Sequence, residues 1–464
     1  MEELQGDILI VGLGVSGEAA AAYCAARASS GDPVSVTVVD SGDSDALRIR
    51  AERLRGMGAD VRLGTSIVAA TYDLAIASPG IPPQAELMFE VRRSAAEVIS
   101  ELEFAYRRSS CQWLAVTGTN GKTTVTSLLG HLLSVAGTPA TVVGNIGTPA
   151  ISAVDEIGPP AALVAEVSSF QLALTERFHP RVAVLLNITP DHLDWHGDME
   201  TYTADKARVF ARQGADDTAI IDGDDPGAAR LIDVVRARGV RVVEVSIERV
   251  PDGGAGLSAE GMLTLDAASG PLTLTHRDEL HILGDHNVSN ALAAAAAAHA
   301  FGAAPERISA GLRTFEPIEH RLEPVGAVGG VEYFNDSKAT NPDAALKALA
   351  SFPGRALMML LGGRNKGNSF DELGRAMERA GARAIVFGEA ADRIAGDLLA
   401  TGVQFERAGD LADALRAAAA LAEPGSAVLL SPACASCDEF SGYADRGRTF
   451  RRIVEKMAEG ADGG

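Results

Sequence analysis

Cysteine is scarce in this sequence. The 464 residues contain four cysteines, at positions Cys24, Cys111, Cys434 and Cys437. Four are too few for a disulfide framework in a chain of this length, so a reducing, cytoplasmic setting is expected. Cys434 and Cys437 have the spacing of a redox pair or of half a zinc site, but no second Cys or His pair at zinc spacing accompanies them. Packing or incidental reactivity is the favoured interpretation.

The sequence also lacks a long unbroken hydrophobic run and an excess of positive charge. The longest apolar tract, Ala291–Ala300, is rich in alanine and contains His299, which favours a packed helix over a membrane span. The first seven residues, MEELQGD, are acidic and polar, so no signal peptide is expected. A net charge of −21 argues against nucleic acid or an anionic membrane as the main partner. Small anionic substrates, bound by local Lys, Arg and metal, stay open.

The segment Val116–Thr124 (VTGTNGKTT) follows the apolar run Trp113–Val116 and precedes a helix-like stretch, Val125–Leu133. Such a turn can bind phosphate through backbone N–H groups and the helix N-terminus, with a lysine on the outer phosphates and a hydroxyl on Mg²⁺. The generic G-x-x-x-x-G-K-[ST] pattern is shortened here, because the first glycine is Gly118. A flexible surface turn is the alternative, but the strand–helix junction favours binding of a nucleoside triphosphate.

A second glycine motif lies near the start of the chain. The strand-like Ile8–Val11 leads into GLGVSG (Gly12–Gly17) and an alanine-rich helix, and a second strand, Val34–Val39, ends at Asp40. This βαβ pattern is the fingerprint of a dinucleotide-binding fold. It does not specify NAD, since the same geometry can hold any diphosphate. A structural role in tight strand–helix packing is equally open.

Strand-like and helix-like segments alternate along the chain, which predicts an α/β fold with mainly parallel, doubly wound sheets. We expect three domains: a Rossmann-like N-terminal domain (residues 1–107), a central P-loop ATPase-type domain (108–316) and a C-terminal doubly wound α/β domain (317–464). The central domain includes a β-rich, glycine-interrupted stretch, Val242–Leu283.

Polar residues at two predicted strand ends are candidates for metal binding. Glu166 lies in the apolar run Leu163–Val167, where a carboxylate is costly unless it is paired or binds a metal. With a magnesium–nucleotide site inferred nearby, metal ligation is favoured over a structural ion pair. His192 lies in a cluster of His and Asp, Asn187–His196, after the next apolar strand. This position favours a metal or phosphate role over that of an ordinary polar residue.

Other polar residues are less decisive. Lys206, on the helix-like stretch Tyr202–Arg212, has the pattern of a solvated helix lysine. Asn287 and Asn290 share one face at a helix start, where Asn287 could cap the helix or contact a nucleotide. Polar segments in the C-terminal part suggest a substrate site. They are His320–Arg321, Asn335–Asn341, Gly362–Gly367 and Ser431–Phe440.

The ordered set of motifs resembles the Mur ligases over nearly the whole chain. The matching blocks are GTNGKTT (from Gly118), GNIG (Gly144), E-x-SSFQL (Glu166), N-x-T-x-DH-x-D (Asn187), HN-x-x-NA (His286), HR (His320), NDSKATN (Asn335), LLGG (Leu360) and SPACAS-x-D-x-F (Ser431). The N-terminal glycine motif combined with the NDSKATN and SPACAS blocks indicates the branch of the family that adds D-glutamate.

The resemblance implies ATP-driven amide formation in cytoplasmic peptidoglycan precursor synthesis, and hence a part in cell wall biogenesis, cell shape and division. The carboxylate of UDP-N-acetylmuramoyl-L-alanine would attack the γ-phosphate of ATP, giving an acyl phosphate and ADP. The amine of D-glutamate would then displace phosphate. The implied cofactors are ATP and Mg²⁺ at two sites. The implied partners are small molecules alone, without nucleic acid or membrane, and a monomer is expected.

The resemblance carries over residue by residue. Catalytic roles would fall to Lys122, Asn145, His192 and Lys206. ATP would be contacted by Gly118, Asn120, Gly121, Lys122, Thr123, Thr124, Asn287, Asn290, Arg321 and Asp336. Magnesium would be served by Thr123, Thr124, Glu166, His192 and Lys206, with Lys206 expected as a carbamate because a bare ammonium would repel the metal. The UDP-substrate would be contacted by Gly14, Val15, Ser16, Asp40, Ser41, Gly80 and Asn145, and D-glutamate by Lys338, Thr340, Lys366, Ser436 and Tyr443.

Four positions depart from the family pattern: Gly42 where an arginine can stand, Arg364 in a loop that is often acidic, Cys437 for an apolar residue and Tyr443 for a phenylalanine. Three alternatives stay open. Another Mur ligase or a folylpolyglutamate synthetase would share the central domain. A nicotinamide-dependent oxidoreductase would rest on the first glycine motif alone. A non-catalytic nucleotide-binding regulator would leave the metal and phosphate residues without a purpose.

Overall fold

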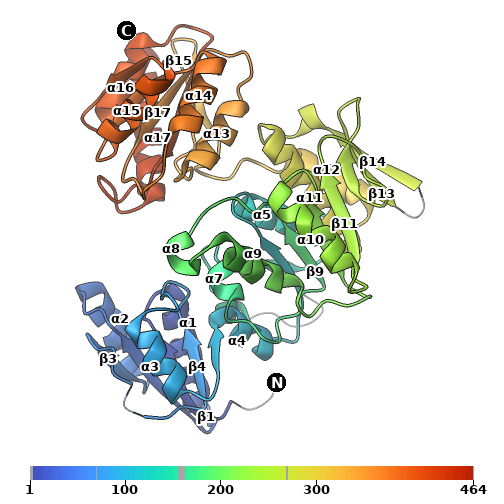
Figure 1. Ribbon diagram of the computed structural model, residues 1–464, viewed down its shortest axis with the longest axis vertical. Coiled ribbons are helices and arrows are strands. Elements are labelled where there is room, and N and C mark those ends of the chain that lie inside the picture. The colour runs from blue at the N-terminus through green and yellow to red at the C-terminus, as the bar shows by residue number, and fades with distance from the viewer. Residues whose placement is uncertain (1–3, 69, 155–161, 268–269, 463–464) are drawn as a thin grey trace. The chain divides into compact units, whose positions relative to one another are not determined.

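The computed structural model describes residues 4–68, 70–154, 162–267 and 270–462. These residues form three mainly parallel β-sheets with helices packed against them, which confirms the predicted α/β class (Figure 1). The chain divides into two compact units, Met1–Glu279 with Ser289–Arg313, and Leu280–Val288 with Thr314–Gly464. The first unit contains two of the sheets. The predicted limits of the three domains stay a prediction.

The N-terminal sheet is fully parallel, with the strand order β3-β2-β1-β4-β5. Its strands are β1 (Gly6–Val11), β2 (Val34–Asp40), β3 (Asp60–Leu63), β4 (Leu74–Ala77) and β5 (Val98–Ser100), and its helices are α1 (Val15–Ser29), α2 (Asp45–Gly56), α3 (Glu86–Ser94) and α4 (Glu101–Arg108). The strand order reverses between β1 and β4, and ligands of open α/β sheets bind beyond the strand ends at such a point.

The central sheet is parallel from β7 to β12 and ends in the antiparallel strands β13 and β14. Its strands are β6 (Gln112–Thr117), β7 (Ala140–Gly144), β8 (Ala162–Glu166), β9 (Val182–Leu185), β10 (Thr218–Asp222), β11 (Arg241–Ser246), β12 (Ala255–Leu257), β13 (Met262–Ala267) and β14 (Gly270–His276). The last four are the predicted β-rich stretch. The apolar run Leu163–Val167 of the sequence analysis contains most of β8.

Helices of this region connect and cover the central strands. They are α5 (Lys122–Val135), α6 (Ala150–Ala153), α7 (Ser169–Leu172), α8 (Leu193–His196), α9 (Met199–Ala207), α10 (Pro226–Arg236), α11 (Asp285–Ala300) and α12 (Pro305–Thr314), with 3-10 turns at Arg208–Phe210 and Arg277–Glu279. The alanines of α11 from 291 to 298 are all buried, so this tract is a packed helix as predicted. Within the described ranges, no helix has the length and apolar character needed to cross a bilayer.

The C-terminal sheet has the order β15-β16-β20-β17-β18-β19, with only β15 and β16 antiparallel. Its strands are β15 (Glu323–Val328), β16 (Val331–Asn335), β17 (Leu357–Gly362), β18 (Arg383–Phe387), β19 (Phe405–Arg407) and β20 (Ala427–Ala433), and its helices are α13 (Pro342–Ala350), α14 (Asp371–Ala380), α15 (Ala391–Thr401), α16 (Leu411–Leu421) and α17 (Tyr443–Asp462). Residues of α13, α14 and α15 form one core with the sheet, and those of α16 and α17 form another. The two cores are the signature of the predicted doubly wound domain.

Candidate active site

The phosphate-loop segment joins β6 to α5 through a turn built on two glycines. Gly118 and Gly121 have φ angles of 154° and 85°, which side-chain-bearing residues rarely adopt. A Cβ atom on Gly121 would also lie 2.6 Å from Oδ1 of Asn290. Asn187 fixes the turn, since its Oδ1 accepts the N–H of Asn120 at 2.7 Å and its Nδ2 donates to the Asn120 carbonyl at 3.1 Å. The predicted strand–turn–helix context is therefore confirmed.

Two lysine side chains meet at this turn. Lys122 Nζ donates to the carbonyls of Gly118 and Thr119, each at 2.9 Å, and Lys206 Nζ donates to the same Gly118 carbonyl at 2.8 Å. Lys206 is only 2% exposed, so its interpretation as a solvated helix lysine is wrong. The sequence pattern gave a wrong prediction for Lys206 because this residue lies one turn after the buried Tyr202, on the inner face of α9. Burial, reinforced by the charge of Lys122, lowers the pKa of Lys206 well below 10.5.

Glu166, the last residue of β8, faces the start of α5. Its Oε2 accepts a hydrogen bond from Thr123 Oγ1 at 2.7 Å, and its Oε1 accepts one from Asn145 Nδ2 at 2.9 Å. The carboxylate is 3% exposed, and these two neutral partners satisfy it, which favours a metal-binding role over an ion pair. Asn145 is in addition tied to the strand by its backbone N–H, which donates to the Glu166 carbonyl at 2.9 Å.

The donor set at Glu166 suits magnesium, because carboxylate and hydroxyl oxygens are ligands that Mg²⁺ prefers. The described residues contain no group of three His, Cys, Asp or Glu side chains suited to a metal ion. A magnesium ion held here would therefore depend on Glu166, on Thr123 and on phosphate oxygens of the nucleotide. Thr124, also predicted as a ligand, is 6% exposed.

His192 lies close to the Glu166 segment in space. It precedes α8 in the left-handed conformation, with a φ of 53°. Its ring centre is 4.8 Å from that of Phe170 in α7, and its Nε2 is 3.5 Å from Asp191 Oδ2. The side chain is 43% exposed, so a ligand could reach it.

A buried chain of polar side chains, which no sequence motif indicated, lies beside this cluster. His196 Nε2 lies 2.9 Å from Ser169 Oγ, and His196 Nδ1 lies 2.8 Å from Asp205 Oδ2. The order Ser–His–Asp is that of a hydrolase triad, but Ser169 is only 3% exposed. The chain instead joins α7, which follows Glu166, to α9 immediately before Lys206. Nothing in the motif spacing distinguished His196 from its neighbours.

The glycines of the N-terminal motif differ in how closely neighbouring atoms surround them. Gly12 has a φ of 86°, and a Cβ atom on Gly17 would lie 1.9 Å from the Gly12 carbonyl oxygen, so these two serve the turn and the close strand–helix packing. A Cβ atom on Gly14 would meet nothing within 4 Å. No neighbouring atom therefore requires a glycine at position 14, and its role in ligand binding stays a prediction.

Three other predicted UDP-contacting residues lie at or after the ends of strands in the same sheet. Asp40 and Ser41 come at the end of β2, and Gly80 follows β4. Val15 is 57% exposed beside a cavity of about 410 Å³. The cavity is lined by Val15, Glu18, Ala19, Ala22, Tyr23, Arg53, Pro149, Ile151 and Ser152.

In the C-terminal unit, two polar loops meet. Lys338 Nζ lies 3.9 Å from the ring centre of Tyr443, and Ser337 Oγ donates to the Tyr443 carbonyl at 2.8 Å. Arg446, which no sequence motif indicated, is fully buried and donates to the carbonyls of Ser337 at 2.8 Å and Cys434 at 3.1 Å. It ties the loop after β16 to the loop after β20. No spacing rule marks such an arginine, because its partners are backbone atoms from remote segments.

The remaining predicted D-glutamate residues differ in burial. Ser436 is 3% exposed, Thr340 is half-buried and Lys366 is exposed. Of the departures from the family pattern, Arg364 forms an exposed ion pair with Glu389 at 3.0 Å.

Three predicted ATP contacts, Asn287, Arg321 and Asp336, belong to the second compact unit. Asp336 is buried and accepts a hydrogen bond from Ser431 Oγ at 2.8 Å, and burial raises its pKa to about 7. Helix α11 begins at Asp285, so Asn287 lies in its first turn and the interpretation of Asn287 as the helix cap is wrong. Its Nδ2 donates to the Leu283 carbonyl at 2.8 Å. The contact of these residues with nucleotide stays a prediction.

Comparison with known proteins decides the family. The family model described as "Mur ligase middle domain" matches residues 116–298, and that described as "Mur ligase, glutamate ligase domain" matches residues 320–434. A protein of Pelotomaculum thermopropionicum named UDP-N-acetylmuramoylalanine–D-glutamate ligase is 41% identical, over 98% of both chains. This chain belongs to the Mur ligase family. A Frankia casuarinae protein of the same name is 44% identical, over 96% of this chain and 93% of its own.

Solved Mur ligase structures share the fold. MurF from Acinetobacter baumannii superimposes with a TM-score of 0.61 at 19% identity, covering 91% of this chain and 90% of its own. UDP-N-acetylmuramate–alanine ligase from Thermotoga maritima gives 0.59 at 18% identity, covering 97% and 100%. Mur ligases are enzymes that use ATP and Mg²⁺. Membership of the family therefore favours a ligase over the oxidoreductase and the non-catalytic regulator.

Proposed function

We propose that this chain is an ATP-dependent ligase that joins D-glutamate to UDP-N-acetylmuramoyl-L-alanine in peptidoglycan precursor synthesis. The observation that carries the proposal is its similarity to proteins named for this reaction, at 41% and 44% identity over nearly the whole chain. The clustering of Lys122, Glu166 and Lys206 around one phosphate-loop turn supports it. We further propose that the protein acts in the cytoplasm as a monomer on small molecules.

The central site provides what phosphoryl transfer to a carboxylate demands. Two anions must approach each other, so their charges have to be offset by fixed cations and dipoles. Lys122 lies over the turn, where its ammonium group can reach the outer phosphates of a nucleotide bound at the N-terminus of α5. Thr123 and Glu166 would hold Mg²⁺, which supplies further positive charge against the phosphate oxygens.

Lys206 would complete this site as a carbamate. The proposal is supported by the depth of burial of the amine and by its 2.8 Å contact with the Gly118 carbonyl. A second ammonium group beside Lys122 would repel a metal ion. A neutral amine can instead add to carbon dioxide, which forms the N–C bond and releases the amine proton, and the product is an anion. His192, exposed near Glu166, would serve the second Mg²⁺.

Substrate binding is proposed at residues of the N-terminal and C-terminal regions. The UDP part would lie at Gly14, Val15, Ser16, Asp40, Ser41 and Gly80, with Asn145 at the reacting end. The C-terminal residues Lys338, Thr340, Lys366, Ser436 and Tyr443 would receive D-glutamate. Lys338 and Lys366 carry charge opposite to the two carboxylates of that amino acid.

The test is release of phosphate from Mg-ATP in the presence of UDP-N-acetylmuramoyl-L-alanine. D-Glutamate is compared with L-glutamate, L-alanine and a diamino acid, and Lys122→Ala serves as the inactive control. Release with D-glutamate alone is expected. Release with a different amino acid would keep the ligase chemistry but assign the chain to another branch, and no release with any of them would refute the proposal.

A further inference from the structure

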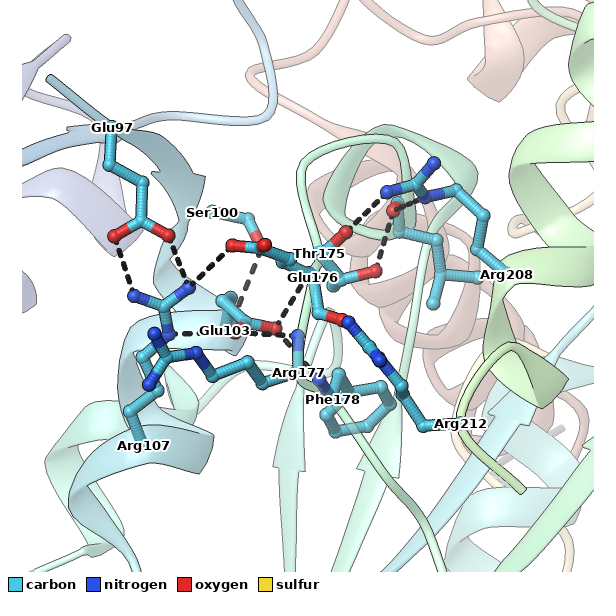
Figure 2. Close-up of polar contacts among 11 residues, drawn as sticks. Glu97, Ser100, Glu103, Arg107, Thr175, Glu176, Arg177, Phe178, Arg208 and Arg212 are labelled. Carbon is cyan, nitrogen blue, oxygen red and sulfur yellow. Dashed lines mark hydrogen bonds and ion pairs between the residues drawn. The ribbon is translucent and has the colours of Figure 1, made fainter. Parts of the chain in front are cut away.

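Helix α4 carries a buried carboxylate that holds a loop of the central region. Glu103 is 0% exposed, and its two oxygens accept the backbone N–H groups of Glu176, Arg177 and Phe178 at 3.0, 2.9 and 2.9 Å (Figure 2). Helix α4 directly follows the last strand of the N-terminal sheet, whereas these three residues precede β9 of the central sheet. One side chain therefore joins the two sheet regions of the first unit.

An arginine completes the environment of Glu103. Arg107 Nε donates to Glu103 Oε1 at 2.7 Å, and its two terminal nitrogens bind the carboxylate of Glu97 at 2.7 and 2.6 Å. A buried carboxylate with three N–H donors and one cation is fully satisfied, and charge-assisted bonds of this kind are the strong ones. Replacing Glu103 would leave buried backbone donors without their acceptor, which is costly. Glu103 therefore holds the loop rather than merely touching it.

The opposite side of the same loop is held by the 3-10 turn that directly follows α9, the helix that carries Lys206. Arg208 Nε donates to the Leu172 carbonyl at 2.9 Å, and its Nη2 donates to the Thr175 carbonyl (Figure 2). Arg208 lies two residues after Lys206, and Leu172 ends the short helix α7 that begins three residues after Glu166. The loop of residues 172–178 is thus attached to Glu103 on one side and to the Lys206 segment on the other.

We propose that Glu103 is a positioning residue for phosphoryl transfer, which fixes the loop of residues 172–178 and thereby holds Glu166 and Lys206 at the phosphate loop. The proposal rests on the ligase activity proposed above. At the phosphate loop, Glu166 contacts Thr123 at 2.7 Å and Lys206 contacts the Gly118 carbonyl at 2.8 Å. A displacement of about 1 Å at a reacting centre can cost on the order of 10²-fold in rate. A shift of the loop would therefore affect turnover more than substrate binding.

The test replaces Glu103 by glutamine, which keeps the shape but turns one acceptor oxygen into a donor facing Arg107 and the loop N–H groups. The expected result is a fall in kcat of about tenfold or more, with the dissociation constant for Mg-ADP, measured by calorimetry, unchanged within about twofold. Glu103→Asp, which keeps the charge, should recover part of kcat. Glu97→Gln is the matched control, because Glu97 pairs with the same arginine but is 33% exposed; its kcat should stay within about twofold.

A lower melting temperature of Glu103→Gln without a change in kcat would overturn the proposal, as would equal losses of kcat in Glu103→Gln and Glu97→Gln. If Glu103→Gln does not fold, Arg208→Lys tests the link from the other side, since lysine keeps the charge but loses the two-pronged contact. Unchanged kcat in Arg208→Lys would then overturn the proposal. An unmodified chain without D-glutamate-dependent phosphate release would refute the proposed function and this inference together. An active chain with unaffected variants refutes this inference alone.

Discussion

Replacing Lys206 by methionine separates the chemical role of this lysine from its contribution to folding. Methionine has a similar length and no charge, so it can occupy a site in which the lysine is only 2% exposed. The lost hydrogen bond to the Gly118 carbonyl is worth about 0.5–1.5 kcal/mol. Removing a buried amine returns a similar amount, because burial disfavours the charged form. The free energy of unfolding should therefore change by less than about 1 kcal/mol.

Turnover should respond far more strongly. Removing one electrostatic stabiliser from an active site costs about 3–4 kcal/mol, which corresponds to about 10²–10³-fold in kcat. The free energy of unfolding of the chain that retains Lys206 should also depend on pH. The pKa of Lys206 is lower in the folded chain than in the unfolded chain, so the unfolded chain binds more protons below 10.5. Stability therefore rises as the pH rises toward 10.5, and the methionine variant should lose this part of the slope.

The assay pairs initial rates of phosphate release with urea unfolding, in buffers with and without added bicarbonate. The enzyme that retains Lys206 should lose activity when carbon dioxide is removed and regain it when bicarbonate is added. The Lys206→Met variant should respond to neither change. Lys456→Met, at an exposed position of α17, controls for the substitution itself. A Lys206→Met enzyme whose kcat stays within about threefold of that of the enzyme with Lys206 would refute the reasoning, because the expected fall in kcat is about 10²–10³-fold.

Four further substitutions test other parts of the structure. Glu166→Gln should raise the Mg²⁺ concentration for half-maximal activity at least tenfold, as measured by magnesium titration, because an amide is a weaker ligand than a carboxylate. Burial raises the pKa of Glu101 from 4.5 to about 7. The protonated side chain therefore contributes about 3 kcal/mol to the free energy of unfolding at low pH, and this contribution is lost as the pH rises from about 4.5 to 7. Urea unfolding of Glu101→Gln should lack this decline. Gly17→Ala should lower the free energy of unfolding by about 3 kcal/mol, because its Cβ would lie 1.9 Å from the Gly12 carbonyl oxygen. Gly14→Ala should keep the melting temperature of the original chain but raise the KM for the UDP-substrate.

Much of the fold could be predicted from the sequence, because strand and helix boundaries depend on local patterns. The strand predicted at Val34–Val39 forms β2, and the phosphate-loop turn lies between β6 and α5 as predicted. Apolar runs ended by glycine or polar residues mark buried parallel strands, and nothing beyond the neighbouring residues is needed to recognise them. The carboxyl ends of such strands then indicate where a site can lie.

The environment of Lys206 could not be predicted in this way. Tyr202 and Lys206 are four residues apart and form the buried side of α9, yet a pattern rule assigns a lysine to solvent because burying its charge is costly. The cost is offset by the Gly118 carbonyl, which lies 88 positions earlier in the chain. The roles of Glu103 and His196 could not be predicted for the same reason, because their partners are backbone or side-chain atoms of segments that only the fold brings close.

The turn at Asp40 also bears on the choice between cofactors. The oxidoreductase interpretation needs the carboxylate at the end of β2 for the ribose of a nicotinamide dinucleotide. In the structure, Asp40 Oδ2 accepts the N–H of Leu13 at 2.6 Å and Oδ1 accepts the N–H of Gly42 at 2.7 Å. Both oxygens thus hold the backbone of the loops that would surround a ligand. Asp40 therefore fixes the backbone of the loops after β1 and β2, and the glycine motif with its acidic residue does not by itself specify a particular cofactor.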